Sequence, residues 1–502
     1  MFLTPLSLLF TASCKQNHLI YRRLLIPSSQ GKYFACASVY NMANSKFSYV
    51  RSFEGEDRIP PLQWIVIGLT NNSGKLSCNQ YLKTPSSRAN YTNLMQHAAS
   101  DVLGLIKTIK FAYLHFDSVH FVVDKETMMY QRRSYKLLTY ITSSMVSSFV
   151  TRWQEYFNTD MKQLPMFDGD IHVFPSDQLL RDYLTMHQMQ HHYVNLKQTL
   201  HLSVHNCKAD FGLKFETIDR VSLESVSSNV ARLSSVPEGE SEGWYNEMLF
   251  SQYGVNYNNE PQEFKKGVVC IRQNKKNVVE IDMISQKFGE VTASVVDFKK
   301  NDFWSAKHWD KTSLNIKFNM IKKFKLNEKL LLHAWIVVRI DGKAFHKLSQ
   351  VHQFDKPNDL RAINLMNIAA TEVMKKFPDI TISYGESDEY SFVFDRYTRE
   401  CGRQPFLLVS RVVSVFTAAY VHNWDSAFSG DKVLQYCPQF DGRAVLYSTN
   451  TSLRDYLSWR QSDCHINNMY NTVFWKLIQI KGLTNRESQE HLSGTYSKDK
   501  KQ

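Results

Sequence analysis

The chain has 502 residues, of which 43% are hydrophobic and 22% are charged. This balance is typical of a folded protein, excludes a chain that is disordered throughout, and leaves room for more than one domain. Lys and Arg outnumber Asp and Glu by 60 to 48, so a net charge of +12 favours an anionic partner such as RNA without proving one. The eight cysteines contain no C-x-x-C pair, which indicates a reducing compartment rather than a disulfide framework or a cysteine zinc site.

The N-terminal segment is basic, rich in serine and free of Asp and Glu up to Phe53. This composition is typical of a mitochondrial transit peptide. The alternative is an optional tail, residues 1–41, ahead of a start at Met42. We therefore expect a cytoplasmic protein, with mitochondrial import as the open alternative. No apolar run approaches the length that crosses a bilayer, and we expect no membrane partner.

Self-comparison reveals an internal repeat. Trp64-Ile-Val-Ile matches Trp335-Ile-Val-Val, and Asp117 matches Asp388, both 271 residues apart (335−64 and 388−117). Phe167-Asp-Gly matches Phe440-Asp-Gly 273 residues apart (440−167). We predict a tandem duplication with a first copy over 42–310, a Lys-rich linker over 311–330 and a second copy over 331–502. Because the period is long, each copy should have its own core.

The second copy shows a regular order of elements. A continuous apolar run predicts a buried strand over 335–340, and helical spacing of apolar residues predicts a helix over 360–377. Strands over 380–384 and 390–394 flank a turn, and a second apolar stripe predicts a helix over 409–420. The order β-α-β-β-α is typical of ferredoxin-like folds, so we predict the α+β class.

Two carboxylates in this order favour metal chemistry. Asp341 ends the first strand and Asp388 begins the third, so neighbouring strands would bring both to one sheet edge. Paired carboxylates can hold two Mg²⁺ ions that neutralise a triphosphate. Taken singly, each residue has an ordinary alternative, a turn or a solvated strand end.

Two further segments favour nucleotide or RNA binding. Lys356 stands just before a predicted helix N-terminus, where backbone N–H groups and a lysine favour phosphate. The segment over 459–471 places polar side chains between aromatic residues, which suits hydrogen bonding and stacking with nucleic acid. An ordinary helix cap and a polar surface helix are the respective alternatives.

At these residues the chain resembles the tRNA(His) guanylyltransferase family. The segments VVRIDGKAF, FDKPND, YGESDEYSFVF, FDGRAV and WRQSDCHINNMYNTVFW stand in the family's order over about 333–500. The first copy resembles the family through MANSKFSYVRSFE, YQRRSYK and FDGD.

The resemblance implies two tandem polymerase-palm-like domains of the ferredoxin-like βαββαβ type. It implies addition of a guanosine to the 5′ end of histidine tRNA, working 3′-to-5′, activated by ATP, with GTP as donor and two Mg²⁺ ions. Histidine tRNA and a homo-oligomeric assembly are the implied partners. The implied catalytic residues are Asp341 and Asp388, which with the Gly342 carbonyl are also the metal ligands. The implied nucleotide-binding residues are Asp341, Gly342, Lys343, Ala344, Phe345, His346, Lys356, Asn358, Ser387 and Asp388, and the implied RNA-binding residues are Arg460, His465, Asn467 and Asn468.

Both copies also depart from the family's pattern. The first copy has Thr70 where the second has Asp341, so we interpret it as degenerate. In the second copy, Leu407 stands where the family's R-R-x-x-K lysine stands, a position that the first copy keeps as Lys136. A lysine expected at the triphosphate is therefore missing, and the second copy is interpreted as truncated at its C-terminus. These losses leave open the alternative of a catalytically impaired tRNA-binding or regulatory homologue.

Overall fold

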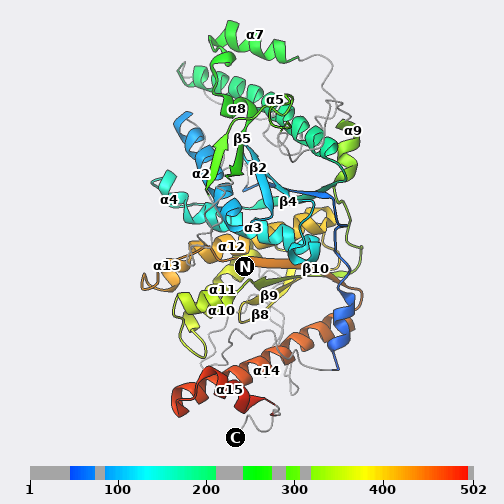
Figure 1. Ribbon diagram of the computed structural model, residues 1–502, viewed down its shortest axis with the longest axis vertical. Coiled ribbons are helices and arrows are strands. Elements are labelled where there is room, and N and C mark those ends of the chain that lie inside the picture. The colour runs from blue at the N-terminus through cyan, green and yellow to red at the C-terminus, as the bar shows by residue number, and fades with distance from the viewer. Residues whose placement is uncertain are drawn as a thin grey trace, which may run out of the picture.

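The computed structural model describes residues 46–73, 85–210, 241–273, 290–305, 318–493 and 495. Helices and antiparallel sheets make up the described chain (Figure 1), which confirms the α+β class. The predicted transit peptide or tail over 1–41 lies outside the described residues.

The second copy forms a four-stranded antiparallel sheet in the order β10-β7-β9-β8. Its strands are β7 (Trp335–Gly342), β8 (Ile380–Glu386), β9 (Glu389–Phe394) and β10 (Phe440–Tyr447). Its helices are α10 (Phe345–Val351), α11 (Leu360–Lys376), η5 (Glu400–Arg403), α12 (Pro405–His422), α13 (Trp424–Ala427), α14 (Asn450–Lys481) and α15 (Asn485–Leu492). All the predicted elements of this copy are therefore present.

Each face of this sheet is covered by helices. Alternate residues of β7 point to opposite faces: Ile336 and Val338 pack with α11 and α12, while Val337 packs with α14. Each fully buried Val or Ile contributes about 1.5–3 kcal/mol. The Asp359 carboxylate caps α11 by accepting from the Arg361 backbone N–H at 3.0 Å.

The first copy repeats this arrangement and extends it to six strands in the order β4-β1-β3-β2-β5-β6. Its strands are β1 (Trp64–Asn71), β2 (Ile109–His115), β3 (Ser118–Val123), β4 (Phe167–Phe174), β5 (Val268–Arg272) and β6 (Val291–Ser294). Its helices are η1 (Ser48–Phe53), α2 (Pro85–Leu105), η2 (Met129–Arg132), α3 (Ser134–Thr151), α4 (Trp153–Tyr156), α5 (Asp177–Asp210), α7 (Glu242–Tyr253), η3 (Tyr257–Asn259) and α8 (Gln262–Lys266).

The two copies pack against each other through α3 and α12, which lie side by side midway along the molecule (Figure 1). The Gly169 backbone N–H donates to Ser410 Oγ at 2.8 Å, and the Gly442 backbone N–H donates to Thr139 Oγ1 at 3.0 Å. These two bonds are equivalent when the copies are exchanged, because Gly169 matches Gly442 and Thr139 matches Ser410. The contact is therefore self-complementary, like that of a two-fold dimer. Each copy has its own core cluster, and at this contact Phe406 of the second copy packs against the core of the first copy.

The copies also exchange their N-terminal arms. Val50 in η1 packs into the second copy beside Val337, whereas Ile321, its equivalent, packs into the first copy. Ile321 ends α9 (Phe318–Ile321), which leads into η4 (Lys322–Phe324). Part of the predicted linker is therefore a structured arm.

Glu54 and Lys325 sit at equivalent places on the two arms with opposite charges. Glu54 pairs with Arg443 of the second copy at 2.6 Å, and Lys325 pairs with Asp170 of the first copy at 2.9 Å. Each arm therefore forms an ion pair with the other copy's sheet. The arm residue is the acid in one pair and the base in the other.

The helix α12 is long and apolar enough, by length and composition, to cross a membrane. It is the only such helix among the residues that the structure describes. The sequence analysis had expected no apolar segment of this length. Because 83% of its apolar window is buried inside the protein, α12 acts as a core helix that joins the two copies.

Candidate active site

The end of β7 and the turn before β9 bring the predicted metal ligands to one sheet edge. The Gly342 backbone N–H donates to the Asp388 carbonyl at 2.9 Å, which ties the two segments together. Ser387 holds the turn in a left-handed conformation with φ of 54°. A side chain at Gly342 would collide with the Phe345 ring, so glycine is required there. The predicted meeting of Asp341 and Asp388 at one edge is thus observed in the backbone.

Further carboxylates gather around Asp341. Glu389 lies opposite it on β9, and Asp441 lies opposite it on β10. Partial burial and then the negative charges of Asp388, Glu389 and Asp441 raise the pKa of Asp341, although 41% of its side chain stays exposed and Arg339 opposes the shift. Oxygen ligands that repel one another in this way are the set that a hard divalent cation stabilises, so these residues fit magnesium.

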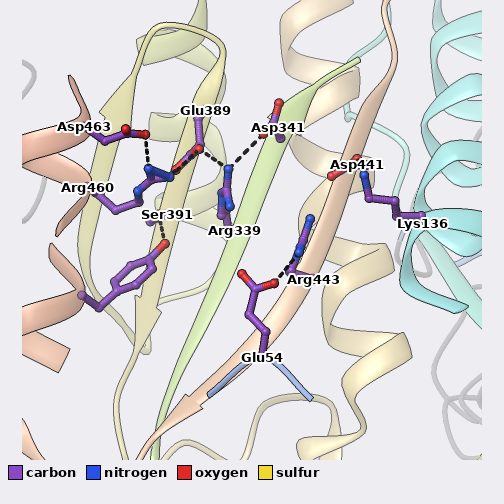
Figure 2. A network of polar contacts seen from close by, with 11 residues as sticks. Glu54, Lys136, Arg339, Asp341, Glu389, Ser391, Asp441, Arg443, Arg460 and Asp463 are labelled. Carbon is purple, nitrogen blue, oxygen red and sulfur yellow. Dashed lines mark hydrogen bonds and ion pairs between the residues drawn. The ribbon is translucent and has the colours of Figure 1, made fainter. Parts of the chain in front are cut away.

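An ion-pair network supports this edge from the side of α14 (Figure 2). Arg339 bridges Asp341, at 3.1 Å, and Glu389. Arg460 of α14 in turn contacts Glu389, at 3.1 Å, and Asp463. Only 2% of the Arg460 side chain is exposed. This arginine, which the sequence placed among the RNA-binding residues, is therefore buried and holds the sheet edge against the long helix.

A pocket beside the turn before β9 is lined by five of the ten predicted nucleotide-binding residues, Asp388 among them. Its walls include Phe345, Lys356, Asn358, Ser387 and Tyr420. A pocket with aromatic walls, a lysine and an amide matches the needs of a base, a phosphate and a ribose.

The loop before α11 is held to α10 and to α14. Lys356 Nζ donates to Ser349 Oγ at 2.7 Å and lies 5.5 Å from the centre of the Trp475 ring. Asn358 Nδ2 lies 3.5 Å from Asn468 Oδ1. The segment 465–468 of α14 therefore borders the pocket through Asn468. On the same helix, Asn467 is half-buried and His465 is exposed.

The segment between β7 and α10 contacts the first copy. Lys343 Nζ lies 3.3 Å from the centre of the Tyr140 ring, a cation–π contact between copies. Burial, with a smaller effect from Lys136, lowers the pKa of Lys343 to about 8, and Asp441 opposes the change. Ala344 is left-handed and exposed, and His346 is exposed on α10.

A lysine of the first copy lies at this edge of the second copy. Lys136 Nζ on α3 lies 3.2 Å from Asp441 Oδ2, across the sheet edge from Asp341 (Figure 2). Leu407 lies one turn before Ser410 and Arg411, on the face of α12 that packs on the first copy. This spacing directs Leu407 toward the first copy's edge, just as Lys136 is directed toward the second copy's edge.

The equivalent edge of the first copy has lost the acidic cluster. Its backbone is the same, since the Asn71 N–H donates to the Asp117 carbonyl at 2.9 Å, as Gly342 does to Asp388. Thr70 instead bonds to Ser118 at 2.9 Å. The Arg411 guanidinium on α12 donates two hydrogen bonds, of 2.6 and 2.8 Å, to the Asp168 carboxylate. A guanidinium thus occupies the edge where the second copy presents carboxylates.

Comparison with known proteins agrees with this geometry. A family model described as tRNA(His) guanylyltransferase matches residues 47–175 and again 318–448, and a second, described as the Thg1 C-terminal domain, matches 234–322 and 451–502. The chain belongs to the tRNA(His) guanylyltransferase family. It is a nucleotidyltransferase, and transfer chemistry, nucleotide binding and tRNA processing are the properties of this family. The second match to the first model begins at the exchanged arm, inside the predicted linker.

Relatives match either the whole duplicated chain or one copy of it. tRNA(His) guanylyltransferase 1 of Arabidopsis thaliana is 34% identical over 92% of this chain and 80% of its own length. tRNA(His) guanylyltransferase of Schizosaccharomyces pombe is 53% identical over 37% of this chain and 70% of its own length. The crystal structure of the Saccharomyces cerevisiae enzyme is 43% identical, covers 37% of this chain and 81% of that chain, and gives a TM-score of 0.35.

Sequence reasoning missed the residues that surround the two aspartates: Arg339, Glu389 and Asp441. A signal was present, because Arg339 interrupts an apolar strand and shares a face with Asp341 two residues later. A charge inside a buried strand requires a partner, and the partner here is Glu389.

Proposed function

We propose that the second copy adds a guanosine to the 5′ end of tRNA(His) and that the first copy completes the site that does so. The observation that carries the proposal is the placing of Asp341 and Asp388 at one sheet edge beside a pocket lined by Lys356 and Asn358. The βαββαβ order of each copy supports a ferredoxin-like, polymerase-palm framework for this site.

Different residues of the site would contact the metal ions, the base, the phosphates and the ribose. Two Mg²⁺ ions, held by the Asp341 and Asp388 carboxylates and the Gly342 carbonyl, would neutralise the triphosphate and align the attacking and leaving oxygens. Phe345 and Tyr420 wall the base. The turn at Ser387 and the segment Lys343, Ala344 and His346 position the nucleotide, with Lys356 at phosphate and Asn358 at ribose.

The reaction consists of two transfers at the tRNA 5′ phosphate. In the first, this phosphate attacks ATP, takes up an AMP group and releases pyrophosphate. In the second, the 3′-hydroxyl of GTP attacks the same phosphorus and AMP leaves. Lys136 and Lys343 would meet the negative charge of the triphosphate from the interface side, since both surround Asp441.

The tRNA would lie along α14, where His465, Asn467 and Asn468 follow one another beside the pocket. Arg460 belongs to this proposal as a positioning residue, because its ion pairs fix Glu389 and Asp463. The net charge of +12 adds dispersed attraction for RNA phosphates.

The rival function is a tRNA-binding homologue without catalysis. Its sequence support was the leucine at 407 together with the interpretation of the second copy as truncated. The position of Lys136 beside Asp441 favours the enzyme, because it offers a lysine where Leu407 offers none. Two further expectations stay predictions: assembly of whole chains into a homo-oligomer, and a cytoplasmic location with mitochondrial import as its alternative.

The test is transfer of labelled GTP by the purified full chain to 5′-monophosphate tRNA(His) in the presence of ATP and Mg²⁺. We expect a product one nucleotide longer, with no transfer by the Asp341→Asn variant. A chain that binds this tRNA and extends none of it would contradict the proposal and favour the rival.

A further inference from the structure

Three histidines of the first copy meet away from the proposed active site. His115 ends β2, His120 lies on β3 and His187 lies on α5. One ring nitrogen from each lies within 4.8 Å of the others, and the two Nε2 atoms of His115 and His120 are 3.0 Å apart. Nitrogens that share a tetrahedral zinc ion stand about 3.3 Å apart when each bond is about 2.0 Å. The cluster is therefore near the spacing of a metal site.

A fourth imidazole borders the cluster. His191 lies one helical turn after His187 on the same face of α5, the i,i+4 spacing with which helices bind metals. Its ring centre is 4.9 Å from that of His115. Its Nε2 is buried and has no hydrogen-bond partner among the residues that the structure describes. A pocket lined by His115, His191 and Arg88 gives the cluster an access route.

The other ring nitrogen of His120 is already fixed. His120 Nδ1 and the Tyr183 hydroxyl are 2.9 Å apart. With Nδ1–H donating to this hydroxyl, the Nε2 lone pair points into the cluster, which is how second-shell partners orient metal-bound histidines.

The same location in the second copy is occupied by the ion-pair network. By the 271 and 273 shifts, Arg339 matches Gly68, Glu389 matches Ser118 and Arg460 matches His187. The charged groups that tie α14 to the second sheet are thus all absent from the equivalent positions of the first copy. His115, His120 and His187 stand in their place between α5 and the first sheet.

We propose that His115, His120 and His187 form a binding site for a borderline divalent transition metal, with Zn²⁺ the expected ion and His191 at the fourth position. Imidazole nitrogens suit this class of metal. The site ties β2, β3 and α5 together and replaces the ion-pair network of the second copy. It does not depend on catalysis at Asp341.

The first test measures zinc bound by the full chain. The protein is stripped with a chelator, equilibrated with ZnCl₂ in excess Mg²⁺ to occupy the carboxylate edge, desalted and analysed for metal. We expect about one zinc ion per chain. Substitution of a ligand in His120→Gln or His187→Gln should weaken binding by more than about 100-fold, beyond the usual cost of losing a second-shell partner.

The matched control is His192→Gln, because His192 follows His191 on α5 but is half-buried and contacts Glu242 instead. This variant should keep its zinc. Equal zinc in wild type and in the His120→Gln and His187→Gln variants would overturn the proposal.

A second measurement decides the matter if those variants fail to fold. Co²⁺ bound to the wild-type chain should give the visible bands of a tetrahedral ion without a sulfur charge-transfer band, and X-ray absorption should show imidazole scattering. A spectrum from oxygen ligands alone would contradict the site.

Discussion

The two sheet edges of this molecule share a backbone and differ in charge. In both copies an N–H at the end of the first strand donates to the carbonyl of the matching aspartate, at 2.9 Å. The second copy surrounds this bond with Asp341, Asp388, Glu389 and Asp441. The first copy has Thr70 in place of Asp341, and its Asp168 forms an ion pair with Arg411. The two copies therefore share the backbone framework of this edge and differ in the charged groups that it presents.

The two edges also differ in the residues that each receives from the other copy. Exchange of helix positions puts α3 of the first copy against β10 of the second, where Lys136 and Tyr140 complete the second copy's edge. The reverse exchange delivers only Leu407 and Arg411 to the degenerate edge. The first copy therefore contributes a lysine and a tyrosine to the second copy's edge, and the second copy contributes no lysine at the equivalent position in return.

The largest effect should follow removal of the metal ligands. Asp341→Asn or Asp388→Asn should lower guanosine transfer by at least about 1,000-fold, because the loss of several kcal/mol of charge stabilisation acts on the transferring phosphate. Affinity for tRNA should change little, since it comes from dispersed phosphate contacts. Single-turnover transfer and filter binding measure the two. Asp425→Asn, an exposed change of the same kind on α13, is the control; near-normal transfer by either ligand variant would refute the two-metal site.

The next effect tests the contribution of the first copy. Lys136→Ala should weaken nucleotide use in the second copy by about tenfold to a hundredfold, the value of a charge-assisted contact of about 1.5–3 kcal/mol. The ratio of kcat to KM for GTP measures it. Lys110→Ala removes a surface lysine of the same copy, paired with Asp124, and should have no effect. Equal behaviour of the two variants would show that the first copy is only a scaffold.

The aspartates and Lys136 differ in how far the sequence alone could predict their positions. Asp341 and Asp388 were predictable because each ends or begins a strand, and neighbouring strands meet at an edge. The role of Lys136 was not, because it depends on how two copies pack, and periodicity within one copy carries no information about that. The structured arm was not predictable for the same reason: residues 318–324, inside the predicted linker, form α9 and η4, which contact α5 and β4 of the first copy.

A smaller effect concerns the exchanged arms. Glu54→Lys should lower the free energy of unfolding by about 1 kcal/mol, since the partly buried Glu54–Arg443 pair becomes two positive charges. Adding Arg443→Asp recreates the polarity of Lys325 and Asp170 in the first copy and should recover the loss. Urea unfolding of the single and double variants measures both. Independent, additive losses would mean that the arm is not held by this pair.

The smallest effect should come from Asp117→Ala. Turnover should change by less than about twofold, because Thr70 is a poor magnesium ligand and the other nearby carboxylate, Asp168, is paired with Arg411. Steady-state transfer with thermal melts checks this. A variant that folds and binds tRNA but loses activity would show that the first copy performs chemistry of its own.

In the proposed site the second copy receives its triphosphate lysine from the first copy, and a rescue experiment tests this arrangement. Leu407→Lys is introduced alone and together with Lys136→Ala, and GTP affinity and single-turnover transfer are measured for each. Because Leu407 lies on the face of α12 that packs against the first copy, the new lysine should reach Asp168 rather than Asp441. We predict that Leu407→Lys leaves transfer unchanged and that the double variant is as impaired as Lys136→Ala. Recovery of transfer in the double variant would place the triphosphate lysine within the second copy itself and contradict the shared site.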